Sequence, residues 1–168
     1  IGEVASIFSF RVTVQLPSEE FKHLLVGQFN LRKTLIQLID FEIAEAGAGR
    51  TASIVLKINS LQDEEMIEKL YAASQAGVKI ELNIRGICSL IAGKKSLSEN
   101  IKAFSIVDRF LEHSRIFLFH HGGQEKMYLA SADWMERNLS FRIETAFPIY
   151  DPVLMAEIKD ILAIQRSD

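Results

Sequence analysis

The sequence predicts an α/β fold, an α-β-α sandwich in which helices flank a mixed β-sheet of about five to seven strands. One reason is a strand–helix–strand pattern over residues 52–84, typical of parallel strands joined by a right-handed crossover. Another is a hairpin pattern over residues 115–130, where two apolar runs flank a turn that contains Gly122 and Gly123. A sheet that holds both patterns is mixed.

The N-terminal third predicts one regular helix. Residues 1–10 resemble the last turns of a helix, and residues 21–26 favour a short strand. Apolar residues recur at helical spacing from position 31, with Asn30 as a suitable N-cap and Gly47 as the stop signal.

The middle of the chain supplies the strand–helix–strand unit. Residues 52–58 form an apolar, β-branched run that fits a strand covered on both faces. A helix then begins with acidic residues at 63–65, which its N-terminus prefers, and ends at Gly77. Residues 78–84 alternate as a strand should, and we expect residues 86–100 to form a loop over the carboxyl edge of the sheet.

The C-terminal third predicts further strands and a closing helix. Residues 101–107 favour a strand followed by a short helical turn to position 111. After the hairpin, residues 141–149 favour another strand. Pro152 suits a helix start, and residues 153–164 are amphipathic.

Composition argues against several classes of protein. With 168 residues, 48% of them hydrophobic, the chain can bury a core and is not expected to be disordered. A net charge of −3 argues against a nonspecific nucleic-acid binder. The single cysteine, Cys88, forms no internal disulfide, fits a reducing cytosol and is expected to be buried. No apolar run approaches the roughly 18 to 20 residues that span a bilayer.

One stretch combines the residues that phosphate chemistry needs. His113 lies two positions before Arg115, and the polar turn of Ser131, Ala132 and Asp133 follows the hairpin. An imidazole exchanges a proton near neutral pH and a guanidinium clamps phosphoryl oxygens. The hydroxyl and the carboxylate can orient the other two groups. We therefore expect a phosphate site with His113 as its catalytic residue.

Other charged residues are candidates for the same site. Arg85 ends a strand before Gly86 and can clamp an oxyanion, and Arg137 and Arg142 follow the polar turn. Lys57 is unusual in an apolar strand, so it either extends to solvent or faces a phosphate site near Asn59. No glycine-rich phosphate loop is present, so side chains would have to bind the phosphate.

The remaining acidic and imidazole groups have weaker signals. Glu144 interrupts an apolar strand, where it either holds the His113 imidazole in one tautomer or is an edge charge. His120 and His121 are interpreted as solvated residues of the hairpin turn. No spacing of histidines, cysteines and carboxylates resembles a zinc site.

Three long segments resemble one known family, the ATP-dependent, histidine-phosphorylating polyphosphate kinases. They are LKINSLQDEEMIEKLYAASQAGVKIELNIRGICSL, LSENIKAFSIVDRFLEHSRIF and YLASADWMERNLSFRIE. The chain is similar to the C-terminal part of these enzymes, whose catalytic core is a pair of phospholipase D-like domains. The resemblance implies that residues 17–168 are the second of these domains and residues 1–16 the tail of the preceding one.

The resemblance also implies roles for particular residues. Family members phosphorylate a histidine of the first domain, which this sequence does not contain. Their second domain contributes an arginine of the RGIC segment and a histidine of the EHSR segment to the nucleotide phosphate site, here Arg85 and His113. A further family arginine follows the SADW turn, and Arg142 matches it better than Arg137. The implied reaction is reversible transfer of the ATP γ-phosphate to polyphosphate.

Cofactor and partners follow from the same resemblance. We expect Mg²⁺ with ligands mainly outside this chain, ATP or ADP and inorganic polyphosphate as ligands, and no nucleic acid. The preceding domain would complete the site, and the full enzyme would be a cytoplasmic homo-oligomer with possible peripheral membrane association. The isolated chain is expected to be inactive.

Two alternatives compete with this interpretation. Phospholipases of the same fold use a His-x-Lys motif and a later Ser-x-Asn, whereas this chain has Arg115 and Asp133 at those places. A phosphodiesterase or nuclease that works as a dimer is therefore one alternative. The other is a structural domain that only completes a neighbouring cleft, in which case His113 would have no catalytic role.

Overall fold

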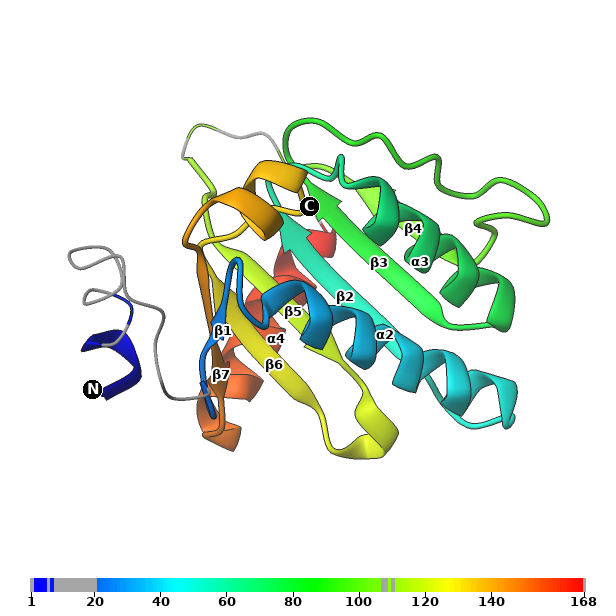
Figure 1. Cartoon of the computed structure of the whole chain (residues 1–168). Helices are drawn as coiled ribbons and strands as arrows, with labels where there is room; N and C mark the ends of the chain where they lie inside the picture. The colour runs from blue at the N-terminus through cyan, green and yellow to red at the C-terminus, as the bar shows by residue number, and fades with distance from the viewer. Residues whose placement is uncertain (1, 6, 8–20, 107–108, 110, 168) are drawn as a thin grey trace.

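A mixed β-sheet with the strand order β1-β7-β6-β5-β2-β3-β4 forms the centre of the molecule. The computed structural model describes residues 2–5, 7, 21–106, 109 and 111–167 (Figure 1). The strands in these ranges are β1 (Leu25–Val26), β2 (Ser53–Ile58), β3 (Lys79–Ile84), β4 (Ile101–Phe104), β5 (Arg115–Phe119), β6 (Lys126–Ala130) and β7 (Thr145–Ile149). β2, β3 and β4 are parallel, whereas β5, β6, β7 and β1 pair antiparallel.

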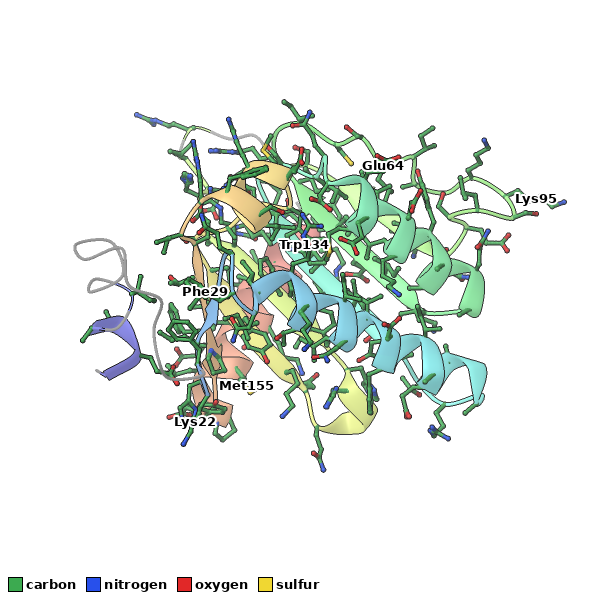
Figure 2. The ribbon with its side chains drawn as sticks, viewed as in Figure 1. Lys22, Phe29, Glu64, Lys95, Trp134 and Met155 are labelled. Carbon is green, nitrogen blue, oxygen red and sulfur yellow. The ribbon has the colours of Figure 1, made fainter. Side chains whose placement is uncertain are left out.

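Helices cover both faces of this sheet, as the α-β-α sandwich predicts. α2 (Leu31–Gly47) and α3 (Glu64–Ala76) lie side by side on one face, and α4 (Pro152–Ser167) lies on the other (Figure 1). The larger apolar core lies under α2 and α3 and includes Trp134, which packs edge-on against Phe117 with ring centroids 5.7 Å apart (Figure 2). A smaller core under α4 contains Ile116, Leu118, Met127 and Leu162.

The strand–helix–strand unit forms as predicted. Residues next to its helix, α3, cap both ends of that helix. The Asp63 side chain accepts a hydrogen bond from Met66 N at the start of α3, and Gly77 ends the helix with a φ of 100°. β2 and β3 then pair in parallel, with Ile54 opposite Ile80. This pairing sends the carboxyl ends of both strands to the same edge of the sheet.

The hairpin of β5 and β6 is also confirmed, but the two histidines of its turn are not fully solvated. His120 and His121 are half-buried, and the His121 ring lies 4.0 Å from that of Phe41. Glu42, a fully buried carboxylate of α2, accepts hydrogen bonds from His121 N at 2.6 Å and Ser53 N at 3.1 Å. The interpretation of both histidines as solvated is therefore wrong, because α2 packs against this part of the turn.

Several predicted boundaries also differ. The strand expected over residues 21–26 is reduced to β1, and the strand expected over 101–107 ends at Phe104. The helical turn expected up to position 111 falls partly outside the described residues. In place of the first part of the strand expected over 141–149, a π-helical turn, η2 (Arg137–Phe141), precedes β7, and a short 3-10 turn, η1 (His121–Gly123), closes the hairpin.

Three smaller expectations have mixed outcomes. Asn30 precedes α2, but its side chain binds Val26 N and Leu24 O and does not cap the helix. Cys88 is exposed, not buried. Residues 2–5 are helical, and the rest of the helix expected over residues 1–10 lies almost entirely outside the described residues. Within the described ranges, no helix is both long and apolar enough to span a membrane.

Candidate functional site

The carboxyl end of β2 is the centre of the candidate site. β3 runs parallel to β2 on one side and β5 runs antiparallel on the other. The end of β2, the end of β3 and the start of β5 therefore meet at one edge of the sheet. The end of β6 and the start of β7 reach the same edge through the antiparallel pairs.

Arg85 and His113 flank this end of β2. Arg85 directly follows β3, and His113 lies two residues before the first residue of β5. Because β3 and β5 are the two neighbours of β2, their ends lie roughly 10 Å apart, which is twice the strand spacing. Topology thus brings together two residues that are distant in sequence.

The side chains of both residues are available to a ligand. His113 is exposed, and its imidazole makes no hydrogen bond to another described residue. Arg85 is half-buried, and within the described part of the chain its guanidinium forms no ion pair. A free imidazole and a free guanidinium at one edge can bind and protonate phosphoryl oxygens.

Asp133 is a buried carboxylate that joins the end of β2 to Arg115. Its Oδ1 accepts hydrogen bonds from Asn59 N at 2.8 Å, from Asn59 Nδ2 at 3.3 Å and from Ser60 N at 3.3 Å. Both carboxylate oxygens also bind Arg115, at 3.2 Å from Nε and 3.0 Å from Nη2. Burial alone would raise the pKa of Asp133, but these hydrogen bonds outweigh it and lower the pKa. Asp133 is therefore held as a carboxylate.

Ser131 and Glu144 form a separate polar pair at the same edge. The Ser131 hydroxyl donates to Glu144 Oε2 at 2.5 Å and accepts from Thr145 N at 3.1 Å. The other carboxylate oxygen of Glu144 accepts from Asn138 Nδ2 at 2.7 Å. Glu144 therefore links the polar turn to η2, and contact with the His113 imidazole, one of its two expected roles, is not made in this structure.

The two later arginines differ in their surroundings only slightly. Arg137 opens η2 and its Nη2 lies 3.6 Å from Met135 Sδ. Arg142 directly follows η2, and its backbone N–H donates to Arg137 O. Both side chains are exposed near the start of β7 and neither forms an ion pair with another described residue. The structure therefore does not rank one above the other as a phosphate ligand.

Lys57 has a partner that its sequence position did not predict. It is 4% exposed, and its Nζ lies 2.5 Å from Glu112 Oε2. Gln165 at the end of α4 donates to the same oxygen at 3.0 Å. The hydrogen bond from Lys57 lowers the pKa of Glu112. Lys57 thus points to the α4 side of the sheet and contacts the residue directly before His113.

Sequence reasoning missed Gln165 and Asn138. Gln165 lies in an amphipathic helix and Asn138 in a segment without clear periodicity, so no local pattern marks either side chain. Their contacts depend on α4 crossing the sheet and on η2 folding back toward β7. Only the packing of these elements identifies them.

Residues 24–168 match the family model described as "Polyphosphate kinase C-terminal domain 2". A polyphosphate kinase of Vibrio vulnificus is 49% identical over 167 residues, which is 99% of this chain and 24% of the relative. The crystal structure of polyphosphate kinase from Porphyromonas gingivalis superposes with a TM-score of 0.93 at 45% identity, covering 98% of this chain and 25% of that chain.

The chain belongs to the polyphosphate kinase family. It spans about a quarter of the length of the polyphosphate kinases that it matches. Nuc from Salmonella typhimurium, a phospholipase D family member, superposes with a TM-score of 0.57 at 15% identity over 82% of this chain and 89% of Nuc. That likeness confirms the predicted phospholipase D-like fold.

The described residues of this polyphosphate kinase domain do not fit a metal centre of their own. Across residues 2–5, 7, 21–106, 109 and 111–167, no group of three or more histidines, cysteines and carboxylates is arranged to hold an ion. Asp133 and Glu144 are already engaged by protein donors.

Gly86→Ala is expected to destabilise this edge of the domain by about 1 to 3 kcal/mol. An added Cβ would meet Asn59 O at 2.8 Å, the atom that accepts the hydrogen bond from Gly86 N at 2.7 Å. Urea unfolding measures the change, and Gly47→Ala is the control because nothing lies within 4 Å of its Cβ. A Gly86→Ala midpoint equal to that of the parent chain would contradict the close approach.

Proposed function

We propose that this chain forms one half of the nucleotide and polyphosphate site of a polyphosphate kinase. The preceding phospholipase D-like domain of the longer protein would supply the other half. The main support is that Arg85 and His113 lie on either side of the end of β2. Neither side chain has a partner among the described residues. Relatives that share almost all of this chain are named polyphosphate kinases, which supports phosphoryl transfer as the reaction.

The proposed reaction proceeds in two transfers. A histidine nitrogen of the preceding domain attacks the γ-phosphorus of ATP, so that a P–N bond forms as the bond to the ADP oxygen breaks. The phosphoryl group then passes to the terminal oxygen of polyphosphate, and the reverse sequence makes ATP from ADP. Arg85 would bind the equatorial phosphoryl oxygens, where charge accumulates in a loose transition state.

His113 would face the attacking histidine from this domain. An imidazole there can give a proton to a leaving phosphate oxygen or donate a hydrogen bond that stabilises the phosphohistidine. Arg137 and Arg142, exposed at the same edge, would bind the polyphosphate chain. Ser131, Glu144, Asn59 and Asp133 would support the edge through the contacts described above.

The remaining features of the full enzyme are also proposals. Any Mg²⁺ that accompanies ATP would be held by phosphate oxygens and by residues outside this chain. We propose a homo-oligomeric enzyme that works in the cytoplasm, with peripheral membrane association of the whole protein and no nucleic-acid partner. The phosphodiesterase alternative gains no support from Arg115, since its guanidinium is already bound to Asp133.

A comparison of the isolated chain with the full-length protein tests this division of labour. The full-length protein is expected to transfer the γ-phosphate of labelled ATP to polyphosphate, whereas residues 1–168 alone are expected to show no turnover, because they lack the attacking histidine. Label transfer from ATP to the isolated chain would contradict the proposal. Cleavage of a chromogenic phosphodiester by the isolated chain would favour the nuclease alternative instead.

A further inference from the structure

We propose that Lys57 and Arg115 are positioning residues that fix the His113 segment, and that neither binds the phosphate chain. This inference rests on the function proposed above for His113. The sequence made both cations candidates for a phosphate site. The structure instead places each of them in contact with a residue at or next to His113.

Lys57 holds the residue before His113. Lys57 is the next-to-last residue of β2 and is almost fully buried, and Glu112 Oε2 lies 2.5 Å from its ammonium. Gln165 Nε2 adds a second donor to that oxygen at 3.0 Å. β2 and α4 are thus both bonded to Glu112, which restricts where the next residue along the chain can lie.

Arg115 holds His113 itself. Its Nη1 donates to the His113 carbonyl at 3.1 Å, while Nε and Nη2 both bind Asp133. Asp133 is in turn fixed to the end of β2 by Asn59 N. The guanidinium is therefore a bridge between the end of β2 and the backbone of His113, and only a planar fork can make these contacts together.

Neither cation is well suited to a phosphate ligand. The charge of Lys57 faces Glu112, and the charge of Arg115 faces Asp133, so an incoming phosphate would meet a carboxylate beside each of them. Arg85, by contrast, has no carboxylate partner among the described residues. At this edge, Arg85 is therefore the cation that can bind the substrate, whereas Lys57 and Arg115 bind carboxylates of the protein.

Kinetics of full-length polyphosphate kinase that contains these residues tests the proposal. Lys57→Met is expected to lower kcat about tenfold, because a catalytic group displaced by about 1 Å loses much of its effect. Its KM for ATP is expected to stay within about twofold of the parent value, because no ligand contact is lost. Arg85→Met is the matched control: its KM is expected to rise because a ligand contact is lost, and its kcat is expected to fall as well. An increase in KM for Lys57→Met with unchanged kcat would overturn the positioning role.

Two further variants keep the test valid if Lys57→Met fails to fold. Glu112→Gln removes the charge of a half-exposed residue and is expected to show the same fall in kcat. Arg115→Lys keeps the positive charge but cannot bridge Asp133 and His113 at once, so its kcat is expected to fall as well. Parent-level kcat in both variants would overturn the proposal.

The outcome for His113 separates this inference from the proposed function. If His113→Ala retains the parent rate, the function proposed for His113 is wrong. If His113→Ala is inactive while Lys57→Met, Glu112→Gln and Arg115→Lys retain parent kcat per folded enzyme, only the positioning role is wrong. Thermal melting of each variant supplies the folded fraction for this normalisation.

Discussion

His113→Ala in full-length polyphosphate kinase is expected to lower polyphosphate synthesis by at least tenfold, and about a hundredfold if the imidazole is a general acid or base. The loss is expected without loss of stability, because the side chain is exposed and its imidazole bonds to no other described residue. Initial rates of labelled polyphosphate formation from ATP, together with thermal melting, measure both effects.

His23→Ala is the matched control for this prediction. His23 is also exposed, but its Nδ1 lies 3.0 Å from Tyr150 Oη. Tyr150 follows the end of β7, whose first residue is at the candidate site, so His23 lies toward the opposite edge of the sheet. A His113→Ala rate equal to that of His23→Ala would exclude His113 from the catalytic site.

Asp133→Ala is expected to lower the free energy of unfolding by about 3 to 5 kcal/mol, the range for breaking a buried ion pair. The change leaves the guanidinium of Arg115 without its carboxylate partner, and the backbone N–H groups of Asn59 and Ser60 without their acceptor. Urea unfolding of the 168-residue chain measures it. A loss below about 1 kcal/mol would mean that the contacts of Asp133 do not stabilise this edge of the sheet.

The contribution of Asp133 is also expected to depend on pH. Its pKa is lower in the folded chain than in the unfolded chain, where an aspartate has a pKa of about 3.9. The unfolded state therefore takes up the proton first as the pH falls. The stabilisation is present above about pH 4 and is lost as the pH falls through the folded pKa. The stability difference between the parent chain and Asp133→Asn should shrink below pH 4, and a constant difference would contradict the assignment.

Much of the fold could be predicted because its signals are local. The acidic start of α3, the glycine that ends it and the two-residue period of β3 are all written within a few residues of one another. The start of β7 could not be predicted in this way. Gly27 N donates to Glu144 O at 2.7 Å, and a Cβ at Gly27 would meet Arg142 O at 2.5 Å, so backbone from a distant segment packs where a strand was expected.

The site was predictable in its location but not in its contacts. Arg85 and His113 could be identified from their positions at strand ends, because the sheet topology brings the end of β3 and the start of β5 to the same edge. The partner of Lys57 could not be inferred, since Glu112 is 55 residues away in the chain. The burial of His121 could not be inferred either, since its hydrogen-bond partner Glu42, on the buried face of α2, is 79 residues away in the chain.

Arg85 and His113 are proposed to bind one phosphate group between them. A crystal structure of full-length polyphosphate kinase with a non-hydrolysable ATP analogue tests it most directly. We expect a phosphoryl oxygen within hydrogen-bond distance, about 3 Å, of the Arg85 guanidinium and of the His113 imidazole. Phosphates bound elsewhere, with both side chains directed into solvent, would contradict it.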